Sequence, residues 1–265
     1  MSNTSTGTAL VTGASGGIGA VYAARLAKRG YNLILVARNT DRLNQVARRI
    51  REESGQSVEV VPADLGNATE LLQIETRLKN DESITLLVNN AGFGSKESVL
   101  EARVDEMTAM IDLNVTALTR LTYAAAPAMA ARRHGTIINI ASVVAIAPEL
   151  LNGVYGASKA FVLALSHSLQ QELAESGVRI QAVLPGATAT DFWNIAGVGG
   201  HENLPQSWVM STEDMVDAAL VGLDAGEKVT IPSLQDGREW DNWEAERRVI
   251  SSHLSASQPA PRYTR

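Results

Sequence analysis

Tyr155 and Lys159 stand four residues apart in the segment Tyr155-Gly156-Ala157-Ser158-Lys159. On a helix, this spacing puts both side chains on the same face. A nearby ammonium group favours the phenolate, so the pair could move a proton at a milder pH than a free phenol allows. A half-buried tyrosine beside a solvated lysine has the same spacing, so the function of the pair depends on the residues that accompany it.

Two other polar residues stand at positions where chemistry is possible. Ser142 ends a short apolar run that is predicted to be a strand, so its hydroxyl should project from the carboxyl end of a sheet. Asn114 lies between Leu113 and Val115 early in a predicted helix, where an amide is disfavoured unless it has a partner. A solvated helix face is the alternative for Asn114.

A glycine-rich segment, TGASGGIG, runs from Thr12 to Gly19 between an apolar run and a helical stretch. Gly13 permits a tight turn, Gly17 lets the backbone approach a phosphate, and Gly19 lets the helix pack on the sheet. The free N–H groups and the positive end of the helix dipole favour a pyrophosphate. The strand–turn–helix context predicts dinucleotide binding rather than a merely flexible turn.

The residue after the second predicted strand bears on which nicotinamide cofactor binds. That residue is Arg38, and the nearest acid, Asp41, is better interpreted as a first-turn helix residue. An arginine here can pair with the extra phosphate of NADP, whereas an acid would bind the ribose hydroxyls of NAD. NADP(H) is therefore predicted, with NAD(H) or a solvated surface arginine as alternatives. Ser15 and Gly16 supply no second positive charge.

Short apolar runs alternate with helical periodicity along the chain. Strands are predicted at 9–11, 32–37, 58–61, 84–88, 136–140, 178–184 and 229–231. Helices are predicted at 20–27, 41–53, 70–78, 104–110, 113–131, 155–175 and 212–223. This alternation predicts an α/β fold with a Rossmann-type, doubly wound parallel sheet of about seven strands, helices on both faces and a single domain over residues 1–265.

The regular alternation stops after Pro185. Residues 190–210 hold several glycines and two tryptophans, a composition that predicts a substrate lid. Residues 251–265 are rich in Ser and Pro and are predicted to form a flexible tail.

Composition excludes several classes of function. The 265 residues are 45% hydrophobic and carry a formal net charge of −6, which argues against nucleic-acid binding. The chain has no cysteine, so thiol catalysis and disulfides are excluded. No signal-peptide pattern or membrane-length apolar run is present, and a cytoplasmic location is predicted. No cluster of His and carboxylates has metal-ligand spacing, so no metal is expected.

In their order along the chain, these motifs resemble the short-chain dehydrogenase/reductase family, and the match extends from Thr8 to about Val221. The motifs are TGASGGIG at 12–19, Ala63-Asp64-Leu65, Asn89-Asn90-Ala91-Gly92, Asn114, Ser142, Tyr155 to Lys159, and Pro185-Gly186 with Thr190. The arginine directly after the second predicted strand, Arg38, with no acid at that position, resembles the pattern of the NADP-preferring branch of this family. The stretch from Asp112 to Trp193 is similar to bacterial reductases of the DltE-like group.

The resemblance implies roles for individual residues. Asp64 would contact the adenine, Asn90 would lie beside the adenosine ribose, and Pro185-Gly186 would close over the nicotinamide. Local caps and turns are the alternatives for Asp64 and Asn90. The implied cofactor-binding residues are Gly13, Ser15, Gly17, Ile18, Gly19, Arg38, Asp64, Leu65, Asn90, Ala91, Gly92, Tyr155, Lys159, Pro185, Gly186, Thr188 and Thr190.

Reduction of a carbonyl by a hydride needs a polarised oxygen and a proton donor beside the cofactor. Tyr155 is the expected general acid/base, Ser142 the partner of the substrate oxygen, and Lys159 the group that lowers the pKa of Tyr155 and holds the nicotinamide ribose. By the resemblance, Asn114 holds a water that links Lys159 to solvent. These four are the predicted catalytic residues.

The predicted substrate-binding residues are Ser142, Val144, Tyr155 and Trp193. Apolar residues after Ser142 and in the lid would give a mainly apolar pocket, although they could instead pack the lid on the sheet or form a subunit interface. The predicted function is an NADP(H)-dependent carbonyl reductase or alcohol dehydrogenase. A sensor that binds NADP(H) without catalysis is the alternative. A homodimer or homotetramer is expected from the apolar faces of residues 113–131 and 161–173.

Overall fold

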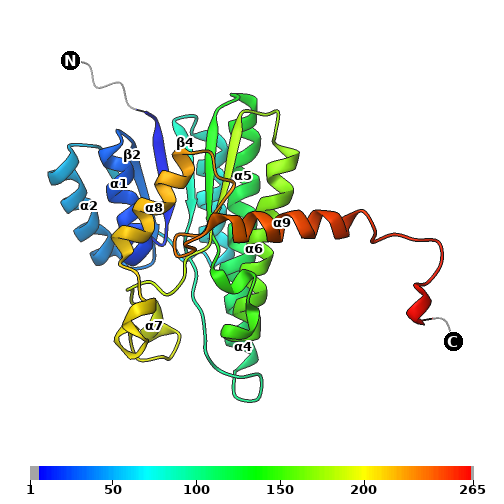
Figure 1. Cartoon of the computed structure of the whole chain (residues 1–265). Coiled ribbons are helices and arrows are strands. Elements are labelled where there is room, and N and C mark those ends of the chain that lie inside the picture. Colours follow the sequence, from blue (N-terminus) through cyan, green and yellow to red (C-terminus); the bar gives the residue numbers. More distant parts are fainter. Residues whose placement is uncertain (1–5, 264–265) are drawn as a thin grey trace. The chain divides into compact units, whose positions relative to one another are not determined.

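The computed structural model describes residues 6–263 (Figure 1). Seven strands of this region form one parallel sheet in the order β3-β2-β1-β4-β5-β6-β7. The strands are β1 Thr8–Thr12, β2 Asn32–Ala37, β3 Val58–Pro62, β4 Ile84–Asn89, β5 Gly135–Ile140, β6 Val178–Val183 and β7 Val229–Thr230. The helices are α1 Gly17–Lys28, α2 Thr40–Ser54, α3 Ala68–Asn80, α4 Val104–Ile111, α5 Leu118–Ala131, α6 Gly153–Glu172, α7 Phe192–Ile195, α8 Thr212–Asp224 and α9 Gly237–Ser251. The predicted doubly wound parallel sheet is confirmed.

Each face of the sheet has its own apolar core. Successive residues of a strand point to opposite faces, so in β1 Ala9 and Val11 pack into one cluster and Leu10 into the other. Helices α1, α2 and α8 contribute to the first cluster, and α3, α5 and α6 to the second (Figure 1). Burial on both faces explains why the strands are continuous apolar runs rather than alternating ones.

The order of the strands reverses between β1 and β4. From β1 the chain adds β2 and β3 on one side, and from β4 it adds the remaining strands on the other. Loops that leave the carboxyl ends of β1 and β4 therefore diverge, and a crevice opens between them. This is the position at which open α/β sheets bind their ligands.

A π-helical segment, Asp112–Ala117, joins α4 to α5. The two helices predicted at 104–110 and 113–131 therefore form one continuous helical stretch. A π turn inserts an extra residue into the helix and rotates the residues around it. Asn114 lies in this turn and is buried.

By internal contacts the chain divides into two units after Pro232. The first unit contains the whole sheet, and the second, from Ser233, contains α9. The sequence interpretation placed no element between the last strand and residue 251. Asp236 caps α9 by accepting from the Arg238 N–H at 3.0 Å, and the rings of Trp240 and Trp243 stack at 4.9 Å.

Beyond α9, the described residues contain a single 3-10 turn, Pro261–Tyr263. The predictions of one domain over 1–265 and of a flexible tail at 251–265 stay predictions. Across the described region, no helix combines the length and the apolar character needed to span a membrane.

Candidate active site

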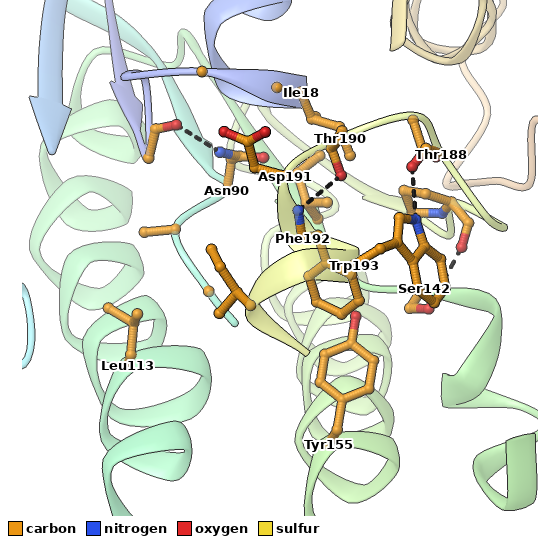
Figure 2. Close-up of a pocket in the computed structure, with 18 of the residues that line it drawn as sticks. Ile18, Asn90, Leu113, Ser142, Tyr155, Thr188, Thr190, Asp191, Phe192 and Trp193 are labelled. Atoms are coloured by element: carbon orange, nitrogen blue, oxygen red, sulfur yellow. Dashed lines mark hydrogen bonds between the residues drawn. The ribbon is translucent and has the colours of Figure 1, made fainter. Parts of the chain in front are cut away.

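A cavity of about 680 Å³ opens at the carboxyl ends of the central strands. Its lining includes the residues that directly follow three of them: Gly13 after β1, Arg38 after β2 and Asn90 after β4. The lid covers one side of the cavity through Thr190, Asp191, Phe192 and Trp193, and Tyr155 points into it from α6 (Figure 2). The volume is within the range of about 300–1,000 Å³ that is typical of small-molecule sites.

Tyr155 and Ser142 bring two hydroxyl groups to this cavity. Tyr155 lies in the first turn of α6, whose cap, Asn152, accepts from the backbone N–H groups of Val154 at 2.8 Å and Tyr155 at 3.3 Å. Ser142 follows β5, and its hydroxyl donates to the Pro185 carbonyl at 3.4 Å. The helix cap and the end of the strand therefore fix the two groups from different elements.

Burial dominates the acid–base properties of Tyr155. It raises the pKa of the phenol well above its ordinary value of 10.0, and a hydrogen bond with Ser142 opposes this shift. Burial lowers the pKa of Lys159 from 10.5 to about 8. Lys159 was predicted to lower the pKa of Tyr155, but burial dominates and raises it, because burial disfavours the charged form of each group.

Lys159 lies on the same face of α6 as Tyr155, as their spacing predicts. Its Nζ atom donates to the Ile140 carbonyl at 3.0 Å and lies 5.8 Å from the centroid of the Tyr155 ring. The ammonium group therefore lies within the range of a cation–π contact with the ring.

Asn114 alone among the four predicted catalytic residues does not line the cavity. Its amide oxygen accepts from the Phe93 N–H at 3.1 Å, and its amide nitrogen donates to the Phe93 carbonyl at 2.8 Å and to the Ser158 Oγ at 3.1 Å. Both amide donors are therefore used within the protein. Asn114 joins the loop after β4 to α6, and the predicted water would have to be held by its remaining acceptors.

The turn between β1 and α1 has no room for a side chain at Gly13 or Gly19. A Cβ on Gly13, whose φ is +66°, would lie 2.6 Å from the Asn90 amide nitrogen, and one on Gly19 would lie 2.4 Å from the Gly13 carbonyl oxygen. Asn90 donates to the Thr12 carbonyl at 2.9 Å, which fixes the turn to the end of β4. Gly16 caps α1 without a side chain, so the N–H groups of the first turn remain open to an anion.

The other predicted cofactor residues also line the cavity, apart from Gly19, which packs behind the turn. Arg38 is exposed and has no side-chain partner in the described part of the chain. Asp64 accepts from the Gly66 N–H at 2.9 Å, and Thr188 donates to the Gly186 carbonyl at 3.1 Å. A glycine cradle, an open helix end and an unpaired arginine fit a dinucleotide that carries an extra phosphate.

Apolar side chains line the end of the cavity near Tyr155. The Phe192 ring lies 5.4 Å from the Tyr155 ring, and the Trp193 indole donates to the Thr188 carbonyl at 2.8 Å (Figure 2). Each predicted substrate-binding residue lines the cavity. The residues at this end are Ser142, Val143, Val144, Leu150, Leu151, Tyr155, Phe192, Trp193, Ile195, Leu204 and Trp208.

Sequence reasoning missed several residues of this site. Arg42 in the first turn of α2 and Asp191 of the lid both line the cavity, and Asn152 caps the helix that carries Tyr155. Arg42 could have been suggested by its place in the first turn of the helix that follows Arg38. The cap residue could have been recognised as an Asn that precedes an apolar helix.

Comparison with known proteins gives consistent matches. The family model described as short chain dehydrogenase matches residues 7–197. A solved short-chain dehydrogenase from Sphingobium yanoikuyae in complex with NADPH is 46% identical, with a TM-score of 0.93, and the match covers 97% of this chain and all of that one. The bulky-bulky ketone specific alcohol dehydrogenase from Comamonas testosteroni is 43% identical, with a TM-score of 0.91, over 99% of this chain and 100% of that one. An uncharacterized oxidoreductase of Staphylococcus saprophyticus is 33% identical over 84% of this chain and 93% of its own length.

Proposed function

The chain belongs to the short-chain dehydrogenase family, and from this premise we propose that it is an NADP(H)-dependent oxidoreductase. It interconverts a carbonyl and a secondary alcohol on a mainly apolar substrate. The observation that carries the proposal is the convergence of Ser142, Tyr155 and Lys159 with the glycine turn in one cavity. Such a site contains both a cradle for the cofactor and a proton donor for the substrate.

NADP(H) is the proposed cofactor because Arg38 is exposed at the cavity and has no side-chain partner in the described region. The Sphingobium relative was solved with NADPH, and an L-sorbose reductase that is 28% identical was also solved with NADPH. The open N–H groups of α1 would hold the pyrophosphate, and Arg38 the ribose phosphate.

When bound, the cofactor supplies or accepts the hydride. Ser142 donates a hydrogen bond from its hydroxyl to the substrate oxygen, and Tyr155 gives its phenolic proton to the same oxygen as negative charge develops on it. Charged Lys159 near the ring stabilises the phenolate that remains. Because burial lowers the pKa of Lys159 to about 8, this stabilisation is lost as the pH rises through that value in the free enzyme.

Apolar groups on both sides of the carbonyl define the proposed substrate. Lys159 is the charged side chain that lines the cavity beside Tyr155, where it serves the proton transfer, and the Trp193 indole N–H already has a partner. The neighbouring Trp208, Leu150 and Ile195 are exposed by 70%, 62% and 65%, so they present apolar surface to a ligand. The Comamonas relative, which is named for bulky-bulky ketones, supports the same substrate class.

A panel of ketones with NADPH tests this proposal. Ketones with two bulky apolar substituents should consume NADPH with a higher kcat/KM than methyl ketones or ketones that carry a carboxylate. If the protein binds NADPH but turns over none of the ketones in the panel, the alternative of a non-catalytic sensor is favoured. The cytoplasmic location, the homodimer or homotetramer and the likeness to DltE-like reductases stay predictions.

A further inference from the structure

An ion pair joins the two walls of the cavity near its cofactor end. The Nη1 atom of Arg42 donates to the Oδ2 atom of Asp191 at 3.1 Å. Arg42 lies in the first turn of α2, where its backbone N–H donates to the Asn39 cap at 2.9 Å. Asp191 lies in the lid directly before α7 (Figure 2). Both Arg42 and Asp191 line the cavity. The pair therefore connects the helix beside Arg38 with the lid.

The ion pair between Arg42 and Asp191 is weak, so another anion can replace Asp191 as the partner of Arg42. The side chains of Arg42 and Asp191 are 58% and 70% exposed, and exposed ion pairs contribute about 0–1 kcal/mol. Within the described residues, Arg42 uses one of its side-chain nitrogens, so Nε and Nη2 are open to another acceptor. The Asp191 carboxylate makes no capping bond to α7. A stronger anion at this place would compete for the guanidinium.

Without Arg42, the cofactor end of the cavity has too little positive charge to balance a ribose phosphate. Arg38 is the one charged residue predicted to meet a ribose phosphate, and Ser15 and Gly16 in the glycine turn bring no charge. A phosphate monoester carries about −1.5 to −2 charges near pH 7, which a single arginine only partly balances. Arg42 stands four residues after Arg38 and reaches the same cavity.

We infer that Arg42 is a second ligand of the 2′-phosphate of NADP(H), and that Asp191 competes with this phosphate for it. The inference rests on the proposed NADP(H) cofactor. The phosphate, with its higher charge and three acceptor oxygens, takes the guanidinium from the carboxylate. NAD(H) lacks that phosphate and leaves the pair between α2 and the lid intact.

Measurements of cofactor affinity test the competition between Asp191 and the 2′-phosphate directly, and they do not depend on turnover. The dissociation constants of NADPH and NADH are measured by titration calorimetry on wild type, Arg42→Gln, Asp191→Asn and the double variant. Arg42→Gln should raise the Kd for NADPH roughly three- to tenfold, because one charge-assisted contact is lost. Asp191→Asn should lower it roughly two- to threefold, because the competitor is gone. The double variant should resemble Arg42→Gln, and the Kd for NADH should stay unchanged throughout.

Two further variants, Arg48→Gln and Arg38→Gln, distinguish a failure of this inference from a failure of the proposed NADP(H) cofactor. Arg48→Gln removes an exposed arginine of the same helix that does not line the cavity, and it should leave both dissociation constants unchanged. An Asp191→Asn variant that binds NADPH no better than wild type, or an Arg42→Gln variant that weakens NADPH and NADH equally, overturns the inference. If Arg38→Gln weakens NADPH but Arg42→Gln does not, the inference fails and the proposed cofactor stands. If neither arginine matters and NADH binds as well as NADPH, both fail.

Discussion

Replacement of Lys159 by methionine should stabilise the free protein at neutral pH, because burial of the ammonium group costs folding free energy. The side chain is 6% exposed, and burial lowers its pKa from 10.5 to about 8. A folded-state pKa below the unfolded value means that the unfolded chain binds the proton more tightly. The cost is therefore complete below pH 8 and disappears as the pH rises toward 10.5. The difference between 10.5 and 8 corresponds to about 3 kcal/mol.

The hydrogen bond from Lys159 to the Ile140 carbonyl at 3.0 Å offsets part of this cost. Its loss removes about 1 kcal/mol, so the methionine variant should be more stable than wild type by about 2 kcal/mol at neutral pH. By about pH 9.5, this advantage should have shrunk by about 2 kcal/mol, because the buried lysine of the folded protein has lost its proton while the unfolded lysine still keeps its own. Tyr155 does not interfere, since burial raises the pKa of its phenol above 10.0 and keeps it neutral in the folded state, while its ionisation in the unfolded state is the same in wild type and variant.

Urea denaturation followed by tryptophan fluorescence measures this effect, on cofactor-free protein at about pH 7 and about pH 9.5. Lys79→Met is the matched control, because Lys79 is exposed on α3 and should show no such dependence on pH. A stability difference between Lys159→Met and wild type that is equal at the two pH values would refute the buried-charge reasoning.

Three further changes test the cofactor end, the lid and the mouth of the cavity. Arg38→Asp should reverse the preference from NADPH to NADH, as measured by kcat/KM with each cofactor; a wild type that already prefers NADH contradicts the cofactor assignment. Gly94→Ala would place a Cβ 2.5 Å from the Phe192 ring and 3.1 Å from the Tyr155 ring. This crowding should lower kcat/KM roughly tenfold, as expected for about 1–3 kcal/mol of overpacking, and an unchanged value argues against the observed lid position. Trp208→Ala should raise KM for bulky ketones while the Kd for NADPH stays the same; equal effects on bulky and small ketones would count against a role in substrate binding.

The sheet and the main site motifs could be predicted because their signals are local. Strands buried on both faces are continuous apolar runs, and the spacing of Tyr155 and Lys159 needs only the periodicity of one helix. The glycine pattern of the turn is local in sequence, although the structure shows that part of the reason for Gly13 and Gly19 is a distant residue, Asn90.

Features that depend on distant partners could not be predicted from the sequence. The π turn brings Asn114 to the backbone of Phe93, which is 21 residues away. The sequence pattern reflects only neighbouring residues, and it predicted two helices where the structure has one continuous helical stretch. Arg42 and Asp191 are 149 residues apart, and their pairing follows from the way the lid lies over the cavity. The pKa of Tyr155 was expected from its neighbour Lys159, whereas burial, a property of the whole fold, dominates it.

The central claim is that Tyr155 transfers the proton in an NADP(H)-dependent carbonyl reduction. Tyr155→Phe removes the phenolic hydroxyl and keeps the ring that packs against Phe192. With a bulky ketone and NADPH, kcat should fall by about 10²–10⁴-fold while the Kd for NADPH stays near that of wild type. Undiminished turnover by a folded Tyr155→Phe variant would contradict the account.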